Sequence, residues 1–145
     1  MAQIKKIMCA VDFSEMSAKV AAYTQLLARA LDASVNVVHV APSHAPFVGL
    51  HGSQSAIEGF LEETVSRAEK TMNSFIKDNF SDTEVTSNIL SGYADEEILK
   101  FVRDGNVDII IMGTHGRRGM DRVLFGSVAE RVVKTAPIPV LTIRP

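Results

Sequence analysis

Short apolar runs alternate with longer amphipathic stretches along the whole chain. Most of the runs are rich in β-branched residues and apolar at nearly every position, which is typical of strands buried on both faces of a parallel sheet. Residues 83–90 differ, because apolar and polar residues alternate there, and this predicts an edge strand with one wetter face. The predicted strands are residues 7–11, 35–40, 83–90, 107–112 and 140–143.

The amphipathic stretches between these runs predict helices. Their apolar residues return at three- and four-residue steps, which gathers them on one helical face. In the first stretch, the residues expected to face the sheet are Val20, Tyr23, Leu27 and either Ala30 or Leu31. The predicted helices are residues 14–31, 55–80, 95–104 and 127–135, and the longest of them should cover one face of the sheet.

The alternation of strands and helices predicts an α/β fold, a three-layer α/β/α sandwich around a five-stranded parallel sheet. We expect one domain over residues 1–145, with a long exposed loop at residues 41–52 of the kind that often serves as a lid. Ligands of such sheets bind outside the carboxyl ends of the strands, where the winding reverses. If strands 7–11 and 107–112 are neighbours there, Asp12 and Gly113 face each other over one crevice.

A glycine-rich segment follows the predicted strand 107–112. Three glycines near its start let the backbone pass close to a ligand. Gly126 and Ser127 then open the next helix, and we expect Ser127 to be its N-cap and to form a capping box with Glu130. The free amides and the positive dipole end of that helix would lie beside the loop, so an anion is the expected guest.

This segment matches neither of the two best-known phosphate-binding loops. It lacks the Gly-Lys-Ser/Thr ending of the P-loop, and its first glycines are spaced G-x-x-G-x-x-G where the dinucleotide fingerprint needs G-x-G-x-x-G. The loop after residues 7–11 also lacks the Ser-Gly-Gly turn expected of adenylate-forming ATP pyrophosphatases. What the segment has is G-x-x-G, nine further residues, and then Gly-Ser.

The charge balance narrows the classes of partner. Lys and Arg number 15 and Asp and Glu 17, for a net charge of −2, which argues against nucleic acid or a membrane surface as a partner. No apolar run approaches the roughly 20 residues of a membrane span, so we expect a cytoplasmic protein. The single cysteine, Cys9, falls in a predicted buried strand and is expected to have no chemical role.

Five segments of the chain form a joint pattern, namely IMCAVDFS (7–14), VHV (38–40), DIIIMGTHG (108–116), GSVA (126–129) and PIPVL (137–141). As a set they resemble the universal stress protein family, and specifically its ATP-binding branch with a G-2x-G-9x-G-S motif. The resemblance extends over essentially the whole chain. One departure is Ala10, where many members have proline before the Val-Asp pair.

The resemblance implies a Rossmann-like fold of the adenine nucleotide alpha hydrolase type, with strand order 3-2-1-4-5 and bound ATP, alone or with Mg²⁺ or Mn²⁺. Asp12 would then meet the ribose hydroxyls or the adenine edge, and the Val40 backbone would read the adenine. Met112 and Gly113 would line the nucleoside, and Arg117 would add positive charge nearby. The phosphates would be held through backbone amides and one hydroxyl by Gly116, Gly126, Ser127 and Val128.

The last predicted strand is expected at an edge of the sheet. Its nearly continuous apolar residues invite pairing with another chain, and the resemblance implies a homodimer through Val140–Ile143. The alternative is that Arg144, Pro145 and the last helix blunt this edge.

Simpler interpretations stand beside several of these assignments. Asp12 could serve only to cap the first helix, and Gly113 and Gly116 could be plain turn glycines. We interpret His115 as a loop residue rather than a catalytic base.

The function expected from the sequence is that of an ATP-binding regulatory protein of stress responses, with no catalytic residues and no metal site of its own. The alternative is a slow ATPase or phosphotransferase that uses the same pocket, for which Asp12, His115 and Asp121 are the candidate residues. A third class is an interaction module that binds no nucleotide, which the intact glycine set disfavours.

Overall fold

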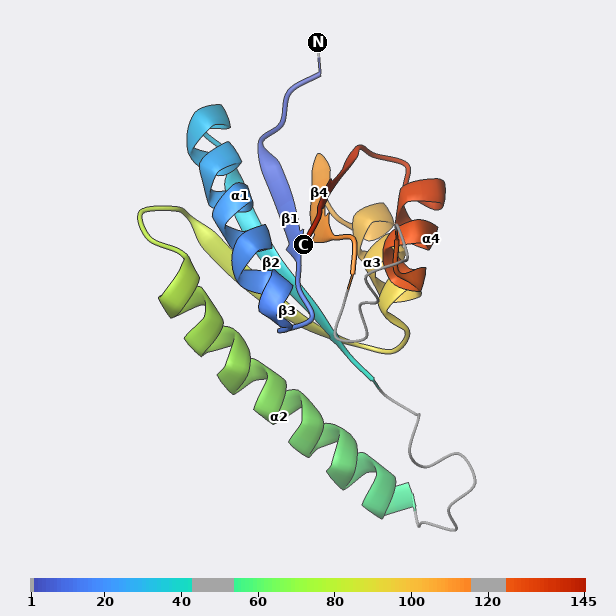
Figure 1. Cartoon of the computed structure of the whole chain (residues 1–145). Coiled ribbons are helices and arrows are strands. Elements are labelled where there is room, and N and C mark those ends of the chain that lie inside the picture. Colours follow the sequence, from blue (N-terminus) through green and yellow to red (C-terminus); the bar gives the residue numbers. More distant parts are fainter. Residues whose placement is uncertain (1, 43–53, 116–124) are drawn as a thin grey trace.

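The computed structural model describes residues 2–42, 54–115 and 125–145 of the chain. Within them, strands and helices alternate as predicted, and the bounds of each element differ from the prediction by no more than two residues (Figure 1). The strands are β1 (Lys6–Ala10), β2 (Ser34–Ala41), β3 (Val85–Ser91), β4 (Ile109–Gly113) and β5 (Val140–Ile143). The helices are α1 (Glu15–Leu31), α2 (Gln54–Asn79), α3 (Ala94–Asp104) and α4 (Ser127–Thr135). Of the predicted loop 41–52, Ala41 belongs to β2 and residues from 43 onward lie outside the described part.

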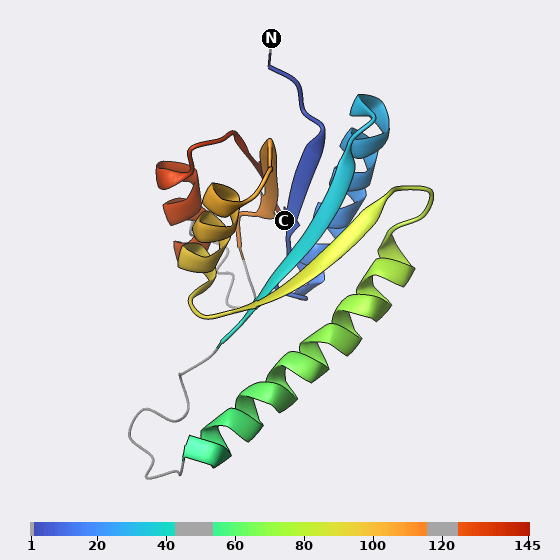
Figure 2. The same ribbon diagram turned by 180° about the vertical axis from the view of Figure 1, so that it is seen from behind.

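The strands form one parallel sheet in the order β3-β2-β1-β4-β5. Helices α1 and α2 cover one face, and α3 and α4 cover the other (Figures 1 and 2). In the register of the sheet, Ala10 lies opposite Val38 of β2 and Met112 of β4. The predicted three-layer sandwich and its strand order are therefore confirmed.

The central strand β1 is buried on both faces, as its apolar run predicted. Ile7 and Cys9 pack in the core beneath α1 and α2, whereas Met8 and Ala10 pack in the core beneath α3 and α4. Burial raises the pKa of the Cys9 thiol to about 12, so the thiol stays protonated at neutral pH. β3 lies at an edge of the sheet, as predicted, but Ser87, which was expected on the drier face, is exposed together with Thr86 and Asn88, so both faces are wet in the middle of the strand.

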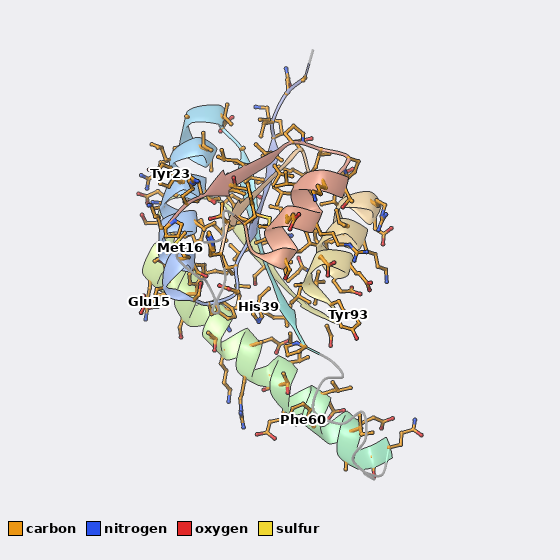
Figure 3. The ribbon with its side chains drawn as sticks, turned by 45° about the vertical axis from the view of Figure 1, so that its right-hand side comes forward. Glu15, Met16, Tyr23, His39, Phe60 and Tyr93 are labelled. Carbon is orange, nitrogen blue, oxygen red and sulfur yellow. The ribbon has the colours of Figure 1, made fainter. Side chains whose placement is uncertain are left out.

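The buried face of α1 is only partly the predicted one. Val20 is buried and Leu27 packs against the core, but Tyr23 and Leu31 are 45% and 39% exposed, and Ala30 is exposed as well. Figure 3 shows Tyr23 on the outer side of the helix. The residues that face the sheet are mostly small: Ser17, Val20, Ala21, Thr24 and Ala28. The prediction was wrong because it followed the large apolar side chains, whereas small ones let the helix approach the sheet closely.

Helix α2 has 26 residues and only its C-terminal half lies on the sheet. There Ala68 and Met72 are buried, and Phe75 and Ile76 pack against the core, while the N-terminal half extends beyond the strands (Figures 1 and 2). The helix is amphipathic rather than apolar. Across the described residues, we find no helix that combines the length and the apolar character needed to span a membrane.

The side chain of Asp108 fastens the start of β1 to the start of β4. Its Oδ2 accepts hydrogen bonds from the backbone N–H groups of Lys5 and Lys6, both at 2.8 Å, and its own N–H donates to the Lys6 carbonyl at 2.9 Å. The two N–H groups that donate to the carboxylate lower its pKa. The register between two strands that are distant in sequence therefore depends in part on a charged carboxylate.

We expect Asp108→Ala to lower the free energy of unfolding by about 1 to 2 kcal/mol at pH 7, because two charge-assisted hydrogen bonds are lost. Since the pKa of Asp108 is lower in the folded protein, its contribution is complete above the ordinary aspartate pKa of about 4 and disappears as the pH falls through the folded-state value. Urea denaturation at pH 7 and pH 3 measures this difference. The exposed Asp104 provides the control, because Asp104→Ala should change stability by less than about 0.5 kcal/mol. Equal destabilisation by Asp108→Ala at both pH values would show that the charge is not needed.

Candidate functional site

A cavity of about 420 Å³ lies at the carboxyl ends of β1, β2 and β4, and the starts of α1, α3 and α4 complete its walls. β1 lies between β2 and β4, so this is the point at which the winding of the sheet reverses. The described residues that were predicted as a site all line the cavity: Asp12, Val40, Met112, Gly113, Gly126, Ser127 and Val128. The other two predicted residues, Gly116 and Arg117, lie outside the described residues.

Asp12 follows β1 directly and is held by the start of α1. Its Oδ1 accepts hydrogen bonds from the Ser14 backbone N–H at 2.9 Å and from the Ser17 hydroxyl at 3.2 Å. The N-cap residue of α1 is Ser14, so Asp12 is not the helix cap that the simpler interpretation proposed. Its carboxylate nevertheless organises the first turn, and Ser17, which is buried, fixes its position from the helix.

Phe13 takes the left-handed backbone conformation, with φ of 60°, which is unusual for an aromatic residue. Its ring stacks on His39 of β2 with centroids 4.2 Å apart, and it meets Phe75 of α2 edge to face at 5.8 Å. His39 in turn places Nδ1 2.9 Å from the Val11 carbonyl. These contacts hold the β1–α1 turn in its unusual conformation, and the turn sets the position of Asp12.

The start of α4 borders the cavity, but its cap differs from the prediction. Gly126 is the N-cap and its carbonyl accepts from the Glu130 N–H at 2.9 Å, whereas Ser127 is the first helical residue. No side-chain hydrogen bond caps the start of α4, so the predicted capping box of Ser127 and Glu130 is wrong. The reason is that the chain enters the helix one residue earlier than the cap preference of serine suggested. The Ser127 hydroxyl is therefore not used for capping.

Gly126 lies close to the turn that contains Gly113 and Thr114. The Gly126 N–H donates to the Thr114 carbonyl at 2.6 Å, and a Cβ added to Gly126 would lie 3.3 Å from the same oxygen. A Cβ added to Gly113 would lie 3.3 Å from the His115 carbonyl. Both glycines are therefore tightly enclosed by the backbone of the turn that follows β4.

Sequence reasoning gave no role to Thr114, His39, Phe13 or Ser17, although all four shape the site. Thr114 is buried within the turn that follows β4, and its N–H donates to the Ile143 carbonyl of β5 at 2.9 Å. The sequence signal that could have identified Thr114 was a polar residue directly after a buried strand. The partners of such residues come from distant parts of the chain, so the pattern alone does not identify them.

The lining of the cavity has an apolar part and a polar part. Ala10, Val38, Ile98 and Met112 line the first, and they are buried residues of the core beneath α3 and α4. The N-terminus of α4 contributes the second, where first-turn amides that have no partner within the helix and the helix dipole favour an anion. Asp12 is the acidic group between the β1 end and the start of α1. Such a site suits an elongated ligand with a flat apolar part and a negative part.

Groups suited to catalysis are sparse in the described part of the chain. Of the three residues considered for phosphoryl transfer, Asp12 and His115 line the cavity, and Asp121 lies outside the described residues. In ranges 2–42, 54–115 and 125–145, no three His, Cys, Asp or Glu side chains are grouped so that they could hold a metal ion.

Comparison with known proteins identifies the family to which this fold and cavity belong. Residues 3–144 match the model of the universal stress protein family. The chain belongs to the universal stress protein family. Universal stress protein MJ0531 of Methanocaldococcus jannaschii is 35% identical over 142 residues, which cover 97% of this chain and 82% of that protein.

Solved structures agree with the family assignment. The structure of hypothetical protein MJ0577 has a TM-score of 0.87 and 28% identity, and the match covers 99% of this chain and 98% of that one. A universal stress protein from Archaeoglobus fulgidus, solved in complex with dAMP, has a TM-score of 0.59 and 25% identity, with 99% of each chain covered. These family members share the whole domain described here rather than a part of it.

Proposed function

We propose that this universal stress protein binds ATP in the cavity and acts as a nucleotide-dependent regulator in stress responses. The observation that carries the proposal is the meeting of an apolar slot, the Asp12 carboxylate and the N-terminus of α4 in one cavity. These three features suit a base, a ribose and a chain of phosphates, respectively. Because ATP is an intracellular metabolite, we propose that the protein works in the cytoplasm.

The adenine is assigned to the apolar slot and to the backbone of Val40. The Val38 carbonyl accepts from the Val11 N–H at 2.9 Å, so the polar groups of Val38 point toward β1. Those of Val40, two residues later in the same strand, point the same way. β1 ends at Ala10, and the backbone of Val40 is therefore directed to the space beyond β1, where a base edge would find a donor and an acceptor.

The phosphates are assigned to the start of α4 beside the turn after β4. Ser127 and Val128 contribute backbone amides of the first helical turn, and Ser127 adds its hydroxyl. The Gly126 amide already donates to Thr114, so we revise its role from donor to spacer, which gives the phosphates room. Any Mg²⁺ or Mn²⁺ would enter with the phosphates, since the described residues provide no metal cluster of their own.

A relative supports an adenine nucleotide as the ligand. The Archaeoglobus fulgidus family member was solved with dAMP, and it matches this chain over its full length. dAMP contains the base, the sugar and one phosphate of the ligand proposed here.

The proposal is tested by denaturing the purified protein, identifying released nucleotides by mass spectrometry, and titrating the emptied protein with ATP in a calorimeter. We expect ATP or ADP in the released fraction and saturable heat on titration, with GTP binding more weakly because the Val40 backbone reads the base edge. A protein that releases no nucleotide and gives no heat with ATP would refute the proposal.

We expect Gly126→Val to weaken ATP binding by more than about tenfold, because its Cβ would lie 3.3 Å from the Thr114 carbonyl and would push the turn after β4 away from the start of α4, where the phosphates are assigned. The domain should still fold, since the φ of −70° and ψ of 163° at Gly126 are open to any residue. Gly59→Val is the matched control, because a Cβ at Gly59 in α2 meets nothing within 4 Å. Calorimetry on both variants decides the assignment, and equal ATP affinity in the two would contradict it.

We also propose that the protein forms a homodimer through β5. Pro139 and Ile143 use their carbonyls to accept from Ile110 and Thr114, so these positions face β4. Thr142, one residue from Ile143, therefore turns its N–H and carbonyl to the outer edge of the sheet. That edge is available for pairing with the same strand of a second copy.

Analytical ultracentrifugation at micromolar concentration should detect a dimer of the wild-type chain. Thr142→Pro should convert it to a monomer, because proline removes an outward N–H while leaving the bonds to β4. The control is Thr142→Val, which keeps the outward N–H and should keep the dimer. A wild-type protein that sediments only as a monomer would exclude the β5 dimer.

A further inference from the structure

Thr114 is only 1% exposed and lies directly after β4, at the turn that leads to the proposed phosphate end of the cavity. A buried hydroxyl is costly unless it is hydrogen-bonded, so its partners indicate why it is there. Thr24, which is also buried, donates to the Val20 carbonyl of its own helix at 2.8 Å and also contacts the Cys9 thiol of β1. The Thr114 hydroxyl has two partners, the Ile143 carbonyl of β5 and the ring of the adjacent His115.

Thr114 joins the turn to β5 and to the start of α4. Its N–H donates to the Ile143 carbonyl at 2.9 Å, and its hydroxyl donates to the same oxygen at 3.4 Å. Its carbonyl accepts from the Gly126 N–H at 2.6 Å. Both polar groups of its backbone are therefore used between segments, and the hydroxyl contributes a further contact.

The Thr114 hydroxyl also meets the ring of His115, with Oγ1 2.8 Å from Nδ1. The hydroxyl has one proton, so it can donate to only one of its two neighbours. If that proton goes to Ile143, both contacts are satisfied when the His115 Nδ1 carries a proton and donates to Oγ1. Whichever neighbour receives that proton, the 2.8 Å contact with Oγ1 orients the His115 ring at the cavity wall.

We propose that Thr114 is a positioning residue for the phosphate half of the site. The inference rests on the proposed ATP function, and it assigns to the buried hydroxyl the task of holding the turn of residues 113–115 against β5 and α4. Asp12 is held separately, by the Ser14 N–H and the Ser17 hydroxyl, and the slot for the base is lined by residues of the core beneath α3 and α4. Loss of the hydroxyl therefore loosens the phosphate end and leaves the nucleoside end unchanged.

The test compares the affinities for ATP and for adenosine in the full-length chain by calorimetry. Thr114→Val keeps the shape of the side chain and removes the hydroxyl, and we expect ATP affinity to fall about fivefold to tenfold while adenosine affinity changes less than about twofold. Thr114→Ser restores the hydroxyl and should bring ATP affinity back to within about twofold of the wild type. Thr24→Val makes the same chemical change in an equally buried threonine outside the cavity and should alter neither affinity.

The ratio of the ATP affinity to the adenosine affinity distinguishes a positioning role of Thr114 from general destabilisation of the protein. A fall in ATP affinity alone, restored by Thr114→Ser, supports the proposal. Equal losses for ATP and adenosine, or no loss, overturn it. If Thr114→Val does not fold, Thr114→Ala is measured in the same way, and the same ratio decides. A wild-type protein that binds adenosine and ATP equally well overturns this inference, whereas one that binds neither overturns the proposed function as well.

Discussion

β1 pairs with β2 on one side and with β4 on the other, and the remaining elements are arranged around these two ladders. The register sets Ala10 between Val38 and Met112, so β1 ends at this level while β2 continues to Ala41. Winding reverses at β1, and the chain therefore leaves β1 and β4 toward helices on opposite faces of the sheet. The cavity lies between the segment that follows β1 and the segment that follows β4. Asp108 contributes to this arrangement from the other end of the strands, because it bonds the backbone at the start of β1.

The two sides of the cavity are held by different kinds of interaction. On the β1 side, Asp12 is fixed by two hydrogen bonds from α1, and the adjoining Phe13 is held by aromatic contacts with His39 and Phe75. On the β4 side, backbone hydrogen bonds through Thr114 join the turn to β5 and α4. The unusual backbone conformation of Phe13 is compensated by ring contacts to two separate elements. Both sides are thus positioned before any ligand arrives, which reduces the entropy cost of binding.

The sequence predicted the elements well because their signals are local. Apolar runs and amphipathic repeats extend over many residues, and the family pattern added the strand order. The errors concern features that depend on how elements meet. Tyr23 and either Ala30 or Leu31 were expected to face the sheet, but small residues let α1 sit closer to the sheet, and all three are exposed. Ser127 was expected to cap α4, but the path of the chain from the turn makes Gly126 the cap.

The site residues also divide into those that local sequence signals identify and those that they do not. Asp12, Gly113 and Gly126 were identifiable because they stand directly at the ends of predicted elements. Thr114 and His39 were not, since their partners Ile143 and Val11 are 29 and 28 residues away in the chain. Contacts of this kind are set by topology, and no local pattern encodes them.

The pairing of β1 with β4 has a consequence for how the molecule folds. Asp108 meets Lys5 across 103 residues of sequence, so closing this ladder brings together segments separated by most of the chain. Such closure is slow, because the chain loses entropy before the contacts compensate for it. The first half of the chain cannot build the cavity during synthesis, since its opposite wall belongs to the last third. Formation of the site therefore coincides with completion of the sheet, and the presence of the site is itself a sign that the chain has finished folding.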